Sequence, residues 1–380
     1  MALLSRLPRS IPALLFLMLL AACVPASATP STATLSPTQR PSLTASKTPS
    51  PTRTLPPSLT PTPPTLPGPF EADFLYDGDT PHTYLEDECQ YLHDRWASGS
   101  AAPGTVVMVI MFHSIVTDDS LPGDKDITQT EFHHLIGDLM NNGFEAITTL
   151  QLADFMESNA WIPERSVLLV VDDRHYRAYF DAFFREYWET DGWPVVNAFI
   201  SASRDGMDAT IWKDQEALHA EGWVDYQAHG VVHNAPMWPG VTDAYILGEL
   251  QGSIDAFQLH FSKSPIAIIW PGGGFSQRSV EVAGSLGYRL GFTVNPRGPL
   301  MYNWVPLADD KDARRPSWEA EGRLGNPLLV LPRYWDGDAA AHLADVITLN
   351  LEASAAAVET RSLELDYYNI VCAPRLGEFP

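Results

Sequence analysis

The sequence predicts an α/β fold, a distorted (β/α) barrel of seven or eight parallel strands. Short apolar segments recur along the chain, and helical patterns lie between most of them. Unusual polar residues follow the ends of these segments, as expected for a site at one end of a barrel. An open doubly wound sheet is the alternative, but no glycine-rich phosphate loop favours it. The expected strands span 105–112, 145–149, 166–171, 194–200, 223–227, 266–270, 288–294 and 328–332.

The expected elements follow one another in a regular order. The apolar run 105–112 suits a strand that is buried on both faces. The pattern over 128–144 is helical, with Gly143 as its C-terminal stop. Further helical patterns span 212–222 and 242–261. The apolar face of the first helix is formed by Phe132, Leu135, Ile136, Leu139 and Met140.

The start of the chain has the pattern of an export signal. Arg6 and Arg9 precede an apolar run that is short for a membrane span. The tetrapeptide "LAAC", which ends at Cys23, resembles the lipobox of bacterial lipoproteins. This resemblance implies a signal peptide over 1–22 and a lipid anchor on Cys23, at the outer side of a bacterial membrane (cell surface or periplasm). An ordinary signal peptide that contains a cysteine is the alternative.

The segment after the signal has the composition of a tether. About two-thirds of the residues from 24 to 68 are Pro, Ser or Thr, and none is acidic. Such a segment cannot bury a core, so we expect a disordered tether over 23–68. Beyond it we expect a lead-in over 69–104, the main domain over 105–349 and a C-terminal tail over 350–380.

The charge of the chain lies almost entirely beyond the tether. All 47 acidic residues follow Pro69, whereas five of the 24 basic residues precede it. An acidic domain of this kind repels nucleic acid, which we exclude as a partner, and favours a neutral ligand such as a sugar chain. Cys89 and Cys372 lie near the two ends of the folded part. They form either a disulfide or two buried free thiols.

Two adjacent carboxylates at the end of the strand "SVLLVV" call for an explanation. Asp172 and Asp173 repel each other unless a cation or a raised pKa compensates them. A solvated turn with a helix-capping aspartate is the plain interpretation. However, His113, His229, Pro271 and Arg333 also follow expected strand ends. In a barrel these ends meet at one face, so their coincidence favours a site.

The histidine pair His229 and His233 predicts a metal site. Residues four apart on a helical turn share a face, so both imidazoles can reach one ion. A carboxylate from the aspartate pair completes a two-histidine, one-carboxylate set that leaves positions open for water and substrate. Zn²⁺ fits such ligands best, although Co²⁺ or Ni²⁺ would bind comparably. Surface histidines at this spacing are the plain alternative.

Taken in order, these segments resemble the polysaccharide deacetylases of carbohydrate esterase family 4, with the NodB-homology fold. The stretch "VVDDRHYRAYF" resembles the family's TFDDG motif, and "AHGVVH" its H-S/T-x-x-H motif. "IIWPGGGFS" stands at its Pro-Tyr-Gly-like loop, and "FHSI" at the Tyr-His of the poly-N-acetylglucosamine deacetylase branch. The resemblance covers about residues 105–345. It implies that Asp172 is the general base and that Asp173, His229 and His233 hold the metal.

The chain also departs from the family pattern. Val171 and Arg174 flank the aspartate pair, Gly230 replaces the Ser/Thr, and Ile269 replaces the arginine of the R-x-P motif. Gly272 replaces the tyrosine after the proline. His113 and His342 are the candidates for the general acid, and we assign His113. Residues expected to contact substrate are Trp270, Pro271, Gly272, Gly273 and Arg333; backbone N–H groups of 272–274 are oxyanion donors unless the loop is a plain turn.

These observations predict a metal-dependent hydrolase that removes N-acetyl (or O-acetyl) groups from an extracellular or cell-surface polysaccharide. It would act on carbon–nitrogen bonds that are not peptide bonds. The expected partners are an acetylated polysaccharide and, through Cys23, a membrane; we expect a monomer. The alternative is a non-catalytic sugar-binding or sensing lipoprotein that retains the fold.

Overall fold

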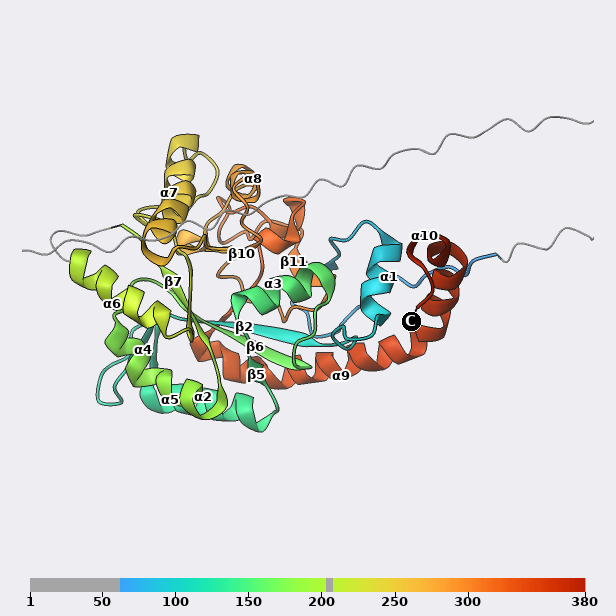
Figure 1. Cartoon of the computed structure of the whole chain (residues 1–380), viewed down its shortest axis with the longest axis horizontal. Helices are drawn as coiled ribbons and strands as arrows, with labels where there is room; N and C mark the ends of the chain where they lie inside the picture. Colours follow the sequence, from blue (N-terminus) through green and yellow to red (C-terminus); the bar gives the residue numbers. More distant parts are fainter. Residues whose placement is uncertain (1–61, 203–207, 380) are drawn as a thin grey trace, which may run out of the picture. The chain divides into compact units, whose positions relative to one another are not determined.

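A parallel β-sheet forms the centre of the computed structural model, which describes residues 62–202 and 208–379 (Figure 1). All pairings within this sheet are parallel, and helices lie on both of its faces, so the α/β barrel prediction is confirmed. The signal peptide expected over 1–22, Cys23 and most of the tether lie outside the described residues. In hydrogen-bonded order the strands are β10 (Leu290–Phe292), β9 (Ala267–Ile269), β8 (Val224–Ala228), β7 (Val195–Phe199), β6 (Arg165–Val171), β2 (Val106–Phe112) and β12 (Tyr334–Trp335), with β5 (Glu145–Ala146) also paired to β6.

In the described part of the chain, four further strands lie outside this sheet. One pair is antiparallel and joins the lead-in to a later segment: β1 (Asp79–His82) and β11 (Val305–Ala308). The other pair is parallel and follows β2: β3 (Ser114–Val116) and β4 (Asp126–Thr128).

The helices occupy most of the segments between the strands. The α-helices are α1 (Glu88–Trp96), α2 (Gln129–Asn141), α3 (Thr149–Ser158), α4 (Arg177–Phe183), α5 (Arg185–Asp191), α6 (Asp208–Ala220), α7 (Asp243–Phe261), α8 (Gln277–Ser285), α9 (Asp336–Tyr367) and α10 (Ala373–Leu376). Shorter helical turns are η1 (Pro271–Gly273), η2 (Glu321–Arg323), η3 (Pro327–Leu329) and the π-turn η4 (Tyr368–Cys372). Within the described ranges, no helix is both long and apolar enough to cross a membrane.

The central strands are apolar throughout because both of their faces are covered. Every residue of β2 is buried, as is every residue of β6 after Arg165. Side chains of a strand alternate between the two faces. Val107 and Val109 therefore join one core, whereas Val106 and Met108 join the other.

The first expected helix forms where its sequence signals place it. Thr128 and Glu131 make a reciprocal capping box at the start of α2, which satisfies two backbone N–H groups. Gly143 follows its end with φ of +75°, a left-handed conformation that suits glycine. Of its expected apolar face, Phe132, Leu135, Ile136 and Leu139 are buried.

The segment before α9 connects the two edges of the central sheet. Leu331 donates to the Gly291 carbonyl and accepts from the Thr293 amide, beside β10. Three residues later, Tyr334 pairs with Ile110 of β2. The strand expected over 328–332 is therefore wrong in position, because it lies at 334–335. Prolines 327 and 332 lack the N–H groups that a regular strand would donate there.

The two ends of the described chain meet beside each other. Cys89 of α1 and Cys372 of η4 form a disulfide, and Leu66 packs against the same small cluster. Figure 1 shows α1 beside α10 near the C-terminus. Helix α9 runs without a break through residue 350, where the sequence analysis placed the start of a tail. Residues 350–367 of the expected tail therefore belong to α9, the longest helix of the described residues, and η4 and α10 follow it.

Candidate metal centre and active site

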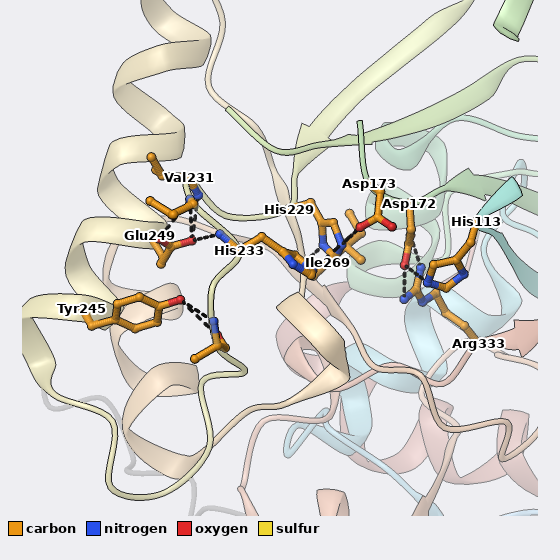
Figure 2. Close-up of polar contacts among 12 residues, drawn as sticks. His113, Asp172, Asp173, His229, Val231, His233, Tyr245, Glu249, Ile269 and Arg333 are labelled. Carbon is orange, nitrogen blue, oxygen red and sulfur yellow. Dashed lines mark hydrogen bonds and ion pairs between the residues drawn. The ribbon is translucent and has the colours of Figure 1, made fainter. Parts of the chain in front are cut away.

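The sequence-predicted site residues converge because they follow neighbouring parallel strands. His113 comes directly after β2, the aspartate pair follows β6, and His229 follows β8. The carboxyl ends of these strands share one edge of the sheet. Figure 2 shows Asp173 beside the histidine pair and Asp172 between that group and His113.

Asp173, His229 and His233 form the one cluster of potential metal-binding side chains in the described part of the chain. Their ligand atoms all lie within 4.8 Å of one another. Asp173 Oδ1 is 3.6 Å from His229 Nε2 and 3.9 Å from His233 Nε2. Atoms bound tetrahedrally to zinc at about 2.0–2.2 Å lie roughly 3.3–3.6 Å apart. The donor set therefore fits one divalent ion, with the Asp173–His229 spacing already in this range and the Asp173–His233 spacing 0.3 Å beyond its upper end.

The imidazole of His229 is oriented so that its outer nitrogen faces this cluster. Its Nδ1 lies 2.8 Å from the carbonyl oxygen of Ile269, which can only accept, so Nδ1 carries the proton. The Nε2 lone pair is then available for a metal. Interaction with the neighbouring His229 holds the pKa of Asp173 well below its usual range despite partial burial, so this carboxylate is ionised. Burial and the neighbouring His229 lower the pKa of His233, which favours the neutral, metal-binding imidazole.

The histidine pair does not lie on a helical turn, so that part of the prediction is wrong. The chain from His229 to His233 is a bend without regular structure. Gly230 has φ of +79° and His233 has φ of +57°, so the backbone turns twice into the left-handed region. Asp173 is also left-handed, with φ of +71°. Such conformations in residues other than glycine cluster at functional sites, where surrounding contacts enforce them.

Asp172 is buried and paired with an arginine. Its two oxygens accept from Arg333 Nη1 at 2.6 Å and Nη2 at 2.9 Å, and the Arg333 side chain is fully buried. Burial alone would raise the pKa of Asp172, but the charge and hydrogen bonds of Arg333 lower it overall. Asp172 is therefore ionised at neutral pH and outside the metal cluster. Arg333 positions this carboxylate, so its expected contact with substrate is wrong.

His113 lies on the other side of Asp172. Its Nε2 is 4.0 Å from Asp172 Oδ2, and its ring stacks on Trp335 with centroids 5.3 Å apart. Burial lowers the pKa of His113. The other candidate acid, His342, is instead hydrogen-bonded to the Tyr76 hydroxyl at 2.9 Å. The structure thus brings His113 to the aspartate pair.

The loop from Trp270 to Gly274 is mostly a packed turn. Trp270 is fully buried and donates from Nε1 to the Leu329 carbonyl, so its expected contact with a sugar is wrong. The amides of Gly273 and Gly274 donate within the turn, to the Trp270 and Pro271 carbonyls. Pro271 and Gly273 are also buried, and Gly272 is the exposed member. The turn therefore offers substrate one glycine rather than a surface.

Three residues at the site were not predicted from the sequence. Glu249 is 2% exposed and accepts a hydrogen bond from the loop that carries the histidine pair. The sequence feature that could have indicated it is an acidic residue among the apolar positions of the 242–261 helix. Trp335 and Asp336 had no usable signal, because the last strand was expected earlier. Burial raises the pKa of Asp336 to about 7. Asp336, which the charge of Asp172 influences, thus titrates close to neutral pH, whereas Asp172 does not.

Comparison with known proteins finds a similarity in the central part of this fold. The family model for polysaccharide deacetylases matches residues 162–291. This segment, about a third of the chain, is similar to the polysaccharide deacetylase family. It contains the aspartate pair, both metal-site histidines and Glu249, whereas His113 and Arg333 come from outside the matched residues.

Individual relatives are distant. The Bacillus subtilis (strain 168) protein YxkH, which carries the name of a polysaccharide deacetylase, is 23% identical over 201 residues. That alignment covers 50% of this chain and 64% of the relative. Among solved structures, the Streptococcus pyogenes deacetylase PplD is 18% identical, with a TM-score of 0.48 over 62% of this chain and 93% of its own. BC0361 of Bacillus cereus, a polysaccharide deacetylase, is also 18% identical with a TM-score of 0.48, over 64% of this chain and 69% of its own.

The described domain should depend on Arg333 for stability. Replacing this residue by methionine leaves the buried Asp172 carboxylate without its partner, which should lower the free energy of unfolding by about 3–5 kcal/mol. The double variant with Asp172→Asn removes the charge as well and should recover most of that loss. Denaturant unfolding of the metal-free proteins measures both. An Arg333→Met protein as stable as wild type would contradict the pairing.

Proposed function

We propose that this chain is a metal-dependent hydrolase that removes N-acetyl (or O-acetyl) groups from an extracellular or cell-surface polysaccharide. One observation carries the proposal. A compact Asp-His-His ligand cluster stands beside a buried, ionised carboxylate that does not belong to it. This division suits hydrolysis, because one group of side chains holds the metal while the other is free to move a proton.

The residues that would hold the metal are Asp173, His229 and His233. A divalent ion bound there, zinc fitting the ligands best, would supply a Lewis acid that lowers the pKa of water and polarises the acetyl carbonyl. Three protein ligands leave room for water and substrate, as in catalytic zinc sites. Asp173 would be neutralised by the ion, which answers the charge problem posed by the aspartate pair.

The proton transfers fall to residues outside the cluster. Each Asp172 oxygen keeps a lone pair beyond its bond to Arg333, so Asp172 can take the proton of the attacking water. Because burial lowers the pKa of His113, this imidazole would act as the acid only after it gains a proton. The proton that Asp172 takes from the water is the source, since His113 Nε2 lies 4.0 Å from Asp172 Oδ2, and His113 would then pass it to the leaving amine. Its stacking on Trp335 keeps the ring beside Asp172. Acid and base thus lie on one side of the ligand cluster.

Variants of the two aspartates separate these roles. Asp173→Asn, His229→Ala or His233→Ala should lower metal content and acetate release together, because each removes a ligand. Asp172→Asn should retain the metal while turnover falls by roughly 10²–10⁴, the usual contribution of a positioned base. Metal analysis and acetate release from a panel of acetylated glycans measure both. The proposal is falsified if Asp172→Asn loses metal while Asp173→Asn keeps it.

We also propose that the chain is exported and lipid-anchored at Cys23, so that the enzyme works at the outer side of a bacterial membrane. The basic residues, short apolar run and "LAAC" tetrapeptide of the first residues support this location. Cys23→Ser should abolish lipid attachment and leave either an uncleaved precursor or a soluble protein. Cell fractionation with lipid labelling measures this. A processed Cys23→Ser protein that stays on the membrane would contradict the anchor.

A further inference from the structure

The loop that carries His233 is attached to helix α7 by a buried carboxylate. Glu249 accepts hydrogen bonds from the backbone amides of Val231 at 2.8 Å, Val232 at 3.1 Å and His233 at 3.1 Å (Figure 2). Glu249 is 2% exposed. The last of these amides belongs to the expected metal ligand itself, so the carboxylate fixes the backbone from which the imidazole projects.

The loop conformation explains why an anion fits there. Consecutive N–H groups that point to one side form a concave anion-binding surface. The left-handed φ values of Gly230 and His233 produce this arrangement and are costly for histidine. A Cβ on Gly230 would lie 2.4 Å from Glu249 Oε2, so only glycine leaves room for the carboxylate. Glycine at this position, where the family pattern has Ser/Thr, and Glu249 therefore belong together.

A second residue of α7 holds the far end of the same loop. The Tyr245 hydroxyl accepts from the Ala235 amide at 3.0 Å and donates to the Ala235 carbonyl at 3.1 Å (Figure 2). Tyr245 and Glu249 are four residues apart, so they lie on the same face of the helix. His233 is therefore fixed between two attachment points on one rigid element.

We propose that Glu249 is a positioning residue that holds His233 ready to bind the metal. The proposal rests on the metal site of the proposed function. Helix α7 supplies no ligand itself, but through Glu249 it would control the affinity of the site for the metal. Outer residues that orient a ligand typically contribute 10–100-fold to metal affinity. Because Glu249 bonds to the backbone of His233, its effect should act through this one ligand.

Metal affinity of the full chain tests the proposal without any measurement of turnover. Glu249→Met keeps the length of the side chain but has no acceptor oxygen, so affinity for Zn²⁺ and Co²⁺ should fall by about 10–100-fold. Glu249→Gln retains one oxygen and should lose less. Asp255→Asn is the matched control, since it removes an exposed carboxylate of the same helix that, among the described residues, bonds only to Gln251. Competition with a chromophoric chelator gives the dissociation constants, and melting of the metal-free proteins shows that they are folded.

A double-mutant cycle distinguishes positioning from a general weakening of the domain. In a His233→Ala background, Glu249→Met should change the remaining metal affinity by less than about twofold, because the ligand that it orients is absent. An equally large loss in both backgrounds would overturn the proposal. So would Glu249 variants that bind metal as tightly as wild type.

Tyr245→Phe keeps the proposal testable if Glu249→Met does not fold. This variant removes both bonds to Ala235 and should weaken metal binding several-fold, again only when His233 is present. Unchanged affinity in Tyr245→Phe and in Glu249→Gln would overturn the inference. A folded wild-type chain that binds none of Zn²⁺, Co²⁺ and Ni²⁺ would instead overturn the proposed function, and the inference with it.

Discussion

Two adjacent carboxylates at the end of a buried strand must each have a different compensating charge. Asp172 is fully enclosed and is neutralised by Arg333, which reaches it from the segment that joins the two edges of the sheet. Asp173 turns the other way, with φ of +71°, and faces two imidazoles. Without this separation, two like charges on consecutive residues would raise each other's pKa and neither could serve as an anion at neutral pH.

The rest of the fold supports this separation. Arg333 lies between the contacts of Leu331 with β10 and of Tyr334 with β2, so the segment that bridges the sheet also delivers the guanidinium. The Nε atom of Arg333 donates to the carbonyl of Thr293, the residue after β10, at 2.7 Å. This bond fixes the arginine side chain at the end of β10. On the opposite side, α7 holds the histidine loop. The buried Asp172 carboxylate and the candidate ligand cluster are thus fixed by separate parts of the chain.

The sequence predicts the grouping of the candidate metal ligands better than it predicts their surroundings. Asp173, His229 and His233 could be grouped because strand ends of a parallel sheet meet, whatever the exact loop geometry. The roles of Arg333 and Trp270 could not be foreseen, since polarity and aromatic character do not reveal burial. The last strand was misplaced because "LLVLP" is apolar, although its flanking prolines disfavour a regular ladder. Glu249 was missed because a single charge in an amphipathic helix resembles a tolerated surface residue until its contacts are known.

The most direct test of the account follows acetate and free amine together. Wild-type protein would be stripped with a chelator, reloaded with Zn²⁺ and incubated with an N-acetylglucosamine polymer. The account predicts that acetate and primary amines appear in equal amounts, that both stop in the stripped protein and that both return on reloading. Undiminished acetate release after stripping, or glycan binding without any release by the zinc-loaded protein, would contradict it.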